Sequence, residues 1–197
     1  PKSQFVVTSN VSGRLERLFV SIGDRVKQHQ VIAKIDAELF QQQVERAQAD
    51  LDVANANLAE AESALFAAER EFERSKTLSQ DNILSQSKLD AAEAAYHAAA
   101  ARVKVASATV ASRESALKTA QLNLSYTSVK ATWNGDKGER VIAERFADEG
   151  ALLKANDQIV SVVDIGSIIC VIHMIERDYF RVKPGQRAAV ITDAFPG

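Results

Sequence analysis

The sequence predicts an α+β protein: a long antiparallel α-helical hairpin inserted in a split β domain, with part of a β-barrel domain beside it. Three observations lead to this prediction. All eight Gly and all three Pro lie outside residues 37–124, so nothing in that span breaks a helix. Apolar residues within the span recur at alternating steps of three and four, which is the period of a helix face. A strand-like phrase that precedes the span returns after it.

The first strand-like phrase covers residues 11–36. Short apolar runs such as Val31-Ile32-Ala33 alternate with Gly13 and Gly23, which is the pattern of short strands with glycine at the turns. A unit of about 25 residues buries too little surface to fold alone. The phrase therefore needs a partner elsewhere in the chain.

Two helices of about 40 residues each are expected within residues 37–124, where the strong helix formers Ala, Gln, Glu, Leu and Lys predominate. Each helix carries one apolar stripe with the spacing of a coiled-coil seam. The first stripe is Val44, Ala47, Leu51, Ala54, Leu58, Ala61, Leu65, Ala68 and Phe72; the second is Leu89, Ala92, Tyr96, Ala99, Val103, Ala106, Val110, Leu117, Ala120 and Leu124, with Arg113 out of pattern.

A turn is expected between the helices at residues 79–85. This segment is rich in Ser, Asp and Asn, whose side chains compete with helical backbone hydrogen bonds. The two stripes are also out of register, because continuing the first one would place Gln86 and Glu93 on the seam. The second helix should therefore run back along the first, which brings Asp36 beside Leu124.

The second strand-like phrase covers residues 125–165 and repeats features of the first. Val26 and Leu153 each lie three residues after a glycine, and the phrases close on the apolar-Asp steps Ile35-Asp36 and Val163-Asp164. An antiparallel hairpin would deliver both phrases to one place. We therefore expect the two phrases to be halves of one module.

Further strand-like runs follow in residues 166–197, around a turn at Lys183-Pro184-Gly185-Gln186. With the N-terminal residues, which include Phe5-Val6-Val7, they are expected to form part of a β-barrel. The expected domains are thus a partial barrel (1–10 and 166–197), the split module (11–36 and 125–165) and the helical hairpin (37–124).

The composition excludes several classes of protein. Lys and Arg number 24 against 26 Asp and Glu, so the net charge of −2 offers no strong positive field for nucleic acid. The single cysteine, Cys170, cannot form an internal disulfide, and His29, His97 and His173 do not have metal-ligand spacing. No nucleophile–base pair is apparent in the sequence. We therefore expect no metal, no cofactor and no catalysis.

The sequence contains no leader and no run that approaches the roughly 18 apolar residues of a membrane span. The chain also starts at Pro1 instead of Met. We expect it to be a trimmed part of a longer protein, whose targeting signal and anchor lie elsewhere.

Both strand-like phrases resemble half-motifs of a biotinyl/lipoyl domain. A lipoyl-like domain split by a helical hairpin in turn resembles the periplasmic adaptors, or membrane fusion proteins, of tripartite efflux pumps. The resemblance covers nearly the whole chain, although His29 stands where the family often has Gly, and Thr132 where it often has Pro. It is carried by Gly23-Asp24-Arg25-Val26, Ala33-Lys34-Ile35-Asp36, residues 124–131 and Val182-Lys183-Pro184-Gly185-Gln186.

This resemblance implies a non-enzymatic adaptor in the periplasm of a Gram-negative bacterium, attached to the inner membrane. Such an adaptor bridges an inner-membrane transporter and a TolC-type outer-membrane channel, usually as a ring of six subunits, and serves export of drugs or toxic compounds. Residues 182–197 are more similar to adaptors of proton-driven resistance–nodulation–division (RND) pumps. An adaptor of an ATP-driven (ABC) exporter remains an alternative, and a purely structural coiled-coil hairpin is a less favoured one.

A more specific resemblance lies at the expected turn. Adaptors that engage a TolC-type channel carry an Arg, a Leu four residues later and a Ser seven residues further on. Arg74, Leu78 and Ser85 match this pattern, which implies that they dock the channel. Arg supplies five fixed donors, Leu an apolar side chain and Ser a small hydroxyl. Ser85 is equally well placed to cap the second helix, and capping does not exclude docking.

Structural roles are expected for the other conspicuous residues. His97 should be a surface helix residue and Trp133 a packing residue beside a turn, while Cys170 and Met174 should lie in the core. Lys34 should lie in a strand, displaced from the position of the modified lysine in a carrier domain. Covalent attachment of lipoate or biotin is therefore not expected.

Overall fold

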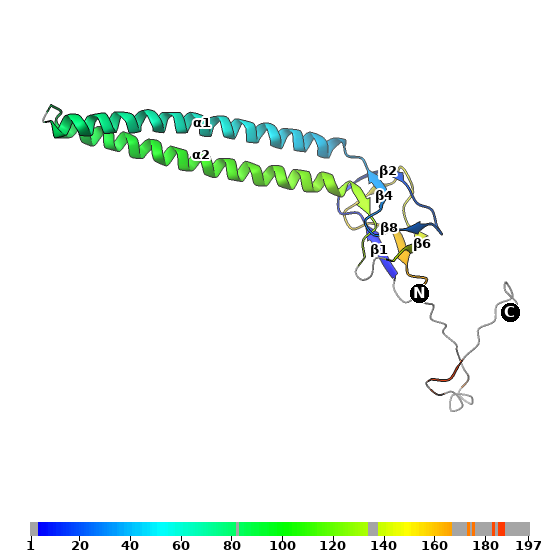
Figure 1. Ribbon diagram of the computed structural model, residues 1–197. Coiled ribbons are helices and arrows are strands. Elements are labelled where there is room, and N and C mark those ends of the chain that lie inside the picture. The colour runs from blue at the N-terminus through cyan, green and yellow to red at the C-terminus, as the bar shows by residue number, and fades with distance from the viewer. Residues whose placement is uncertain are drawn as a thin grey trace.

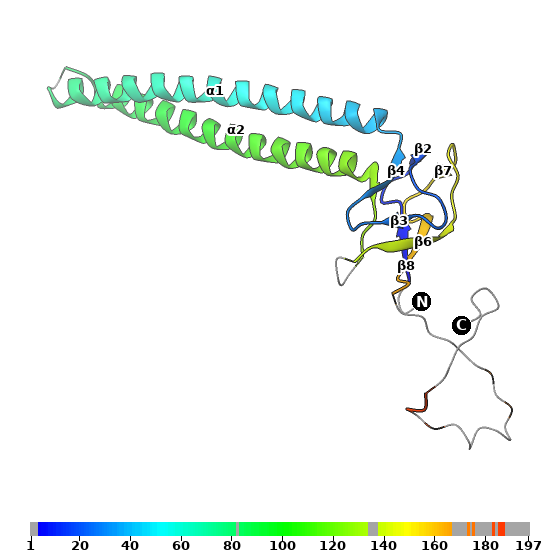
Figure 2. The same cartoon turned by 45° about the vertical axis from the view of Figure 1, so that its right-hand side comes forward.

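A computed structural model describes residues 4–81, 83–133 and 138–166, and also residues 173, 175, 183 and 185–187. A β sandwich lies at one end, and a long helical hairpin projects from it (Figures 1 and 2). The elements are β1 (Gln4–Thr8), β2 (Gly13–Leu18), β3 (Arg25–Val26), β4 (Val31–Ile35), α1 (Glu38–Gln80), α2 (Gln86–Tyr126), β5 (Ser128–Lys130), β6 (Arg140–Arg145), β7 (Leu152–Leu153) and β8 (Gln158–Val163).

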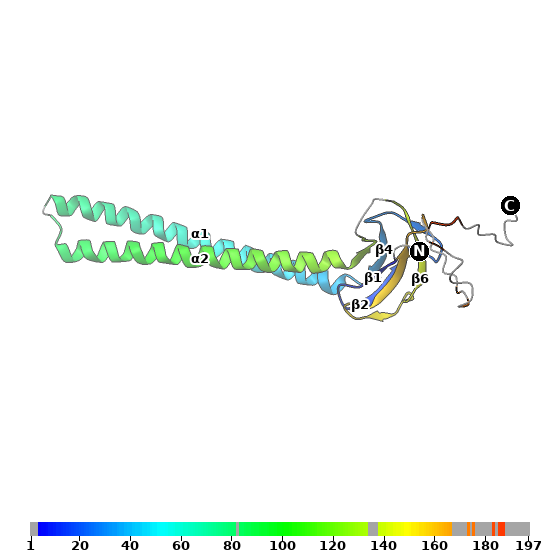
Figure 3. The ribbon, with the colours of Figure 1, turned by 90° about the horizontal axis from the view of Figure 1, so that it is seen from below.

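The predicted antiparallel hairpin is confirmed. Every residue of the two apolar stripes is buried or half-buried between the helices. Near the tip the rings of Phe72 and Tyr96 stack with their centroids 5.8 Å apart. Nearer the sandwich Arg113, which breaks the stripe, approaches the carboxylate of Asp50 on α1 to 3.8 Å. The helices cross in Figure 3, as expected for helices that follow a heptad seam.

Both ends of the hairpin meet the sandwich at one point. The N–H of Ile35, at the end of β4, donates to the carbonyl of Thr127, directly after α2, at 2.8 Å. Phe40 and Tyr126, at the base of the hairpin, pack against the core of the sandwich. Within the described residues neither helix holds a stretch long and apolar enough to cross a bilayer.

The sandwich is built from two interlocked halves, which we define as β1–β4 and β5–β8. One sheet has the strand order β1-β8-β6-β3 and the other the order β5-β4-β2-β7. Each sheet therefore takes its two central strands from one half and its two edge strands from the other half. All strand pairs are antiparallel. Neither half can form either sheet alone.

The two halves are related residue by residue. Adding 127 to a residue number in β2–β4 gives its counterpart in β6–β8. The N–H of Phe19 donates to the carbonyl of Ile32 at 2.8 Å, and that of Phe146 to Ile159 at 2.9 Å. Six counterpart pairs are buried on both sides: Leu15/Ile142, Val20/Ala147, Val26/Leu153, Ile32/Ile159, Ala33/Val160 and Ile35/Val162. The core is therefore shared almost equally by the halves.

Strand β1 corrects one part of the prediction. The sequence pattern places residues 1–10 in a partial barrel, but β1 pairs with β8 just as β5 pairs with β4. Arg140 is only 5% exposed and lies over the rings of Phe5 and Trp133, 4.6 and 5.0 Å from their centroids. The pairing with β8 and these ring contacts place residues 4–8 in the sandwich. Most of residues 166–197, the rest of the expected barrel, lie outside the described residues.

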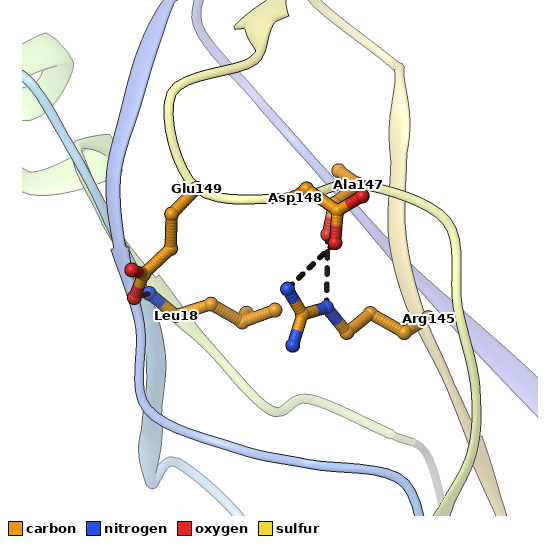
Figure 4. A network of polar contacts seen from close by, with 5 residues as sticks. All are labelled: Leu18, Arg145, Ala147, Asp148 and Glu149. Carbon is orange, nitrogen blue, oxygen red and sulfur yellow. Dashed lines mark hydrogen bonds and ion pairs between the residues drawn. The ribbon is translucent and has the colours of Figure 1, made fainter.

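The loop after β6 forms a hydrogen bond that joins the second half of the sandwich to the first. The carboxylate of Glu149 accepts a hydrogen bond from the N–H of Leu18 on β2, at 2.9 Å. Arg145, the last residue of β6, donates to the carboxylate of Asp148 in the loop at 2.6 Å and to the carbonyl of Ala147 at 3.3 Å (Figure 4). These surface hydrogen bonds stabilise the conformation of the loop and its contact with the first half.

Two equivalent turns contain a non-glycine residue in the left-handed region. His29 has a φ of 66° and its counterpart Asn156 a φ of 73°. In both turns a lysine N–H donates to the side chain three residues later, from Lys27 to Gln30 at 3.0 Å and from Lys154 to Asp157 at 2.7 Å. The turn at residues 183–186 makes the same contact at 3.0 Å and has glycine at the equivalent position, with a φ of 89°.

We therefore expect His29→Gly to raise the free energy of unfolding by about 0.5–1 kcal/mol, because glycine adopts this conformation without steric cost. Asn156→Gly should give a smaller gain, since asparagine tolerates a positive φ better than histidine. Chemical unfolding followed by circular dichroism measures both. Gly150→Ala, at a φ of 87°, is the opposite control and should destabilise. A loss of stability in His29→Gly would contradict the assignment of strain to this turn.

Candidate functional site: the hairpin tip

The hairpin tip is the part of the molecule farthest from the sandwich (Figure 1). Helices of 43 and 41 residues form the hairpin, which corresponds to a reach of about 60 Å at 1.5 Å per residue. At this distance the sandwich cannot cover the tip, so only residues of the hairpin itself lie near it. Side chains that are exposed there are therefore available to another molecule.

Arg74 lies on the outer surface of α1, two turns before its end. Its side chain is 64% exposed, and its guanidinium lies 3.2 Å from the carboxylate of Glu71, one helical turn earlier. An ion pair this exposed is weak, because water screens both charges. Arg74 can therefore exchange Glu71 for a carboxylate or carbonyl of a partner without a large cost.

Leu78 belongs to the end of the hairpin seam. It is half-buried, and its carbonyl accepts a hydrogen bond from the N–H of Ile83 at 2.9 Å. This bond spans five residues and is of the kind that ends many helices. It ends α1 and turns the chain back toward α2, with Leu78 in the last turn of α1.

Ser85 occupies the N-cap position of α2 but does not cap it with its side chain. Its backbone is extended, with φ −73° and ψ 150°, and its hydroxyl makes no capping hydrogen bond. Its carbonyl instead accepts bonds from the N–H groups of Lys88 and Leu89, at 3.0 and 3.3 Å. The expectation that the hydroxyl caps the helix is wrong, and the exposed hydroxyl is left for other partners.

The fold thus brings Arg74, Leu78 and Ser85 to one tip from two helices. Among the described residues, no hydrogen bond or ion pair joins these three side chains to one another. Their docking role stays a prediction. Ile83, which is 71% exposed, is a tip residue that the sequence patterns do not predict. Its place directly after an expected helix end is the only signal that could identify it.

Outside the tip the predicted structural roles hold where they can be tested. Lys34 lies in β4 and pairs with Glu16 at 2.9 Å. Trp133 is 5% exposed, and His97 is an exposed residue of α2 near Glu93. Across the described part of the chain, no three His, Cys, Asp or Glu side chains gather as metal ligands would. Residues 170 and 174, the expected core cysteine and methionine, lie outside that part.

Comparison with known proteins agrees with this architecture. Residues 50–127 match a family model described as "RND MFP, alpha-helical hairpin domain". The macrolide export protein MacA of Yersinia pestis is 30% identical over 198 residues, which cover 97% of this chain and 51% of that protein. The multidrug resistance protein MdtA of Salmonella typhimurium is 28% identical over 193 residues, covering 96% of this chain and 42% of that protein.

A solved structure has the same fold. The crystal structure of MacA from Actinobacillus actinomycetemcomitans superposes with a TM-score of 0.72 at 23% identity, over 82% of this chain and 53% of that one. The chain thus spans about half the length of the relatives it matches.

The geometry of Ser85 leads to a prediction about stability. Replacing a serine that caps a helix with alanine costs typically about 1 kcal/mol. Because the Ser85 hydroxyl makes no capping bond, Ser85→Ala should change the free energy of unfolding by less than about 0.5 kcal/mol. Thr127→Val is the matched control, since the Thr127 hydroxyl is buried and donates to the Leu124 carbonyl at 2.7 Å. A larger loss in Ser85→Ala than in the control would show that Ser85 caps α2.

Proposed function

The chain belongs to the membrane fusion protein family, the periplasmic adaptors of efflux pumps, and from that premise we propose that it links an inner-membrane transporter to a TolC-type outer-membrane channel. The compounds exported would be drugs or other toxic molecules, as the names of the macrolide and multidrug relatives indicate for those proteins. The protein would act in the periplasm, attached to the inner membrane. This role requires no catalysis.

The observation that carries the proposal is the separation of the two ends of the molecule. The hairpin leaves the sandwich on one side, whereas β1 begins and β8 ends on the other (Figure 1). A long stalk that projects from the side opposite these strand ends suits a component that must span a gap between two membrane proteins. The exposed tip with Arg74, Leu78 and Ser85 would meet the channel, and the opposite side of the sandwich would face the transporter.

We further propose that several copies assemble side by side into a ring, with six as the expected number. Support comes from apolar side chains that the single hairpin leaves uncovered. Their spread along both helices would let neighbouring hairpins pack over most of their length. These side chains are Leu39, Val53 and Phe66 on α1 and Val105 and Leu122 on α2, each at least 51% exposed.

For the inner-membrane partner we propose an RND transporter, because the matching family model is described by that class. An ATP-driven exporter is the second candidate. The macrolide export relatives match nearly the whole chain, beyond the hairpin that the family model covers. Pairing the full-length protein with each class of transporter in a cell that lacks its own adaptors distinguishes the two.

The docking proposal predicts the effect of reversing the charge at the tip. Arg74→Asp should weaken binding to a purified TolC-type channel by about tenfold or more, because a docking guanidinium is replaced by a repelling carboxylate. Drug export by cells that carry this variant should fall accordingly. Far-UV circular dichroism and melting temperature should stay at wild-type values, since Arg74 is exposed.

Arg46→Asp is the matched control, because Arg46 is an exposed residue of the same helix near its opposite end. This variant should bind the channel like the wild type. If Arg74→Asp binds and exports as well as the control, the assignment of the docking site to this tip is wrong.

A further inference from the structure

The apex of the hairpin carries an apolar side chain that the family motif does not include. Ile83 is 71% exposed, in the short connection between α1 and α2. An isoleucine in this position contributes almost no burial to the fold of its own chain. Its apolar surface becomes useful only when another molecule covers it.

The position of Ile83 is nevertheless well defined. Its N–H donates to the carbonyl of Leu78 at 2.9 Å, which ties it to the last turn of α1. Leu78 is half-buried in the last turn of α1, so Ile83 is held next to the end of the seam. A contact residue held by its backbone loses little conformational freedom on binding, which favours affinity.

The charges near the apex are arranged around this apolar centre. Arg74 and Lys76 lie on α1 behind the apex, beside Glu71 and Glu73 at 3.2 and 3.9 Å. From residue 78 to residue 85 the sequence contains one charged residue, Asp81. The apex therefore has few charges of its own and has charged residues behind it on α1, and protein interfaces commonly combine an apolar centre with polar surroundings.

We propose that Ile83 is a contact residue that inserts into an apolar depression on the periplasmic end of the outer-membrane channel. This inference rests on the proposed function. It adds Ile83 as a contact residue and specifies that the channel surface it meets is apolar. Arg74 and Ser85 would then supply the polar contacts at the rim, and Ile83 would supply the apolar contact at the centre. The depression must be apolar, because a polar one would leave its own groups without hydrogen bonds against isoleucine.

The test is a binding titration between the full-length adaptor and a purified TolC-type channel in detergent, with four forms of the adaptor. Ile83→Asp should bind about tenfold or more weakly than the wild type, because the change places a charge in the apolar depression. Ile83→Leu should bind within about twofold of the wild type, since it keeps the apolar surface. Ile22→Asp is the matched control and should bind normally, because Ile22 is 65% exposed but lies in the sandwich.

Each outcome decides one point. If the wild type binds and Ile83→Asp binds equally well, this inference is overturned and the proposed function stands. If the wild type itself does not bind, the proposed function fails and the inference fails with it. If Ile83→Asp abolishes self-association in sedimentation but leaves channel binding intact, the apex contacts a second copy of the chain, which also overturns the inference.

Discussion

Each sheet of the sandwich needs strands from both halves of the chain, and the rest of the structure follows from that constraint. The backbone shows it directly: the N–H of Leu15 donates to the carbonyl of Ala151, and that of Ile35 to the carbonyl of Thr127. Buried N–H groups without such acceptors are costly. The strands of the first half are therefore stable only when the second half pairs with them. Any segment inserted between the halves must begin and end at the same place.

An antiparallel helical hairpin meets this requirement at any length. Adding one heptad to each helix extends the reach by about 10 Å while the two ends stay together. The seam supplies its own packing, so the hairpin does not need to lean on the sandwich beyond contacts such as Phe40 and Tyr126. The exposed side chains at the tip are therefore not needed to stabilise the fold. Arg74 and Ile83 can remain exposed because neither contributes to holding the stalk together.

How much of the structure can be predicted from the sequence depends on whether a pattern repeats. The seam recurs over many turns, so all its members can be identified, and the turn between Gln80 and Gln86 follows from the break in register. Paired glycines identify the two halves. Strand β1 is misplaced by the sequence pattern because its counterpart β5 lies after the hairpin and shares little sequence with it. Whether the Ser85 hydroxyl caps α2 depends on the rotamer of one side chain, and the spacing of residues in the sequence does not predict a rotamer.

Amide hydrogen exchange on separated halves shows whether each half needs the other to form its strands. The chain would be divided at the tip into residues 1–82 and 83–197, and protection of the Leu15 and Ile35 amides would be measured in the first fragment. We expect both amides to exchange freely in the isolated fragment and to become protected when the second fragment is added in equal amount. Protection of both amides in the isolated first fragment would contradict the interdependence of the halves, because the first half would then form its strands alone.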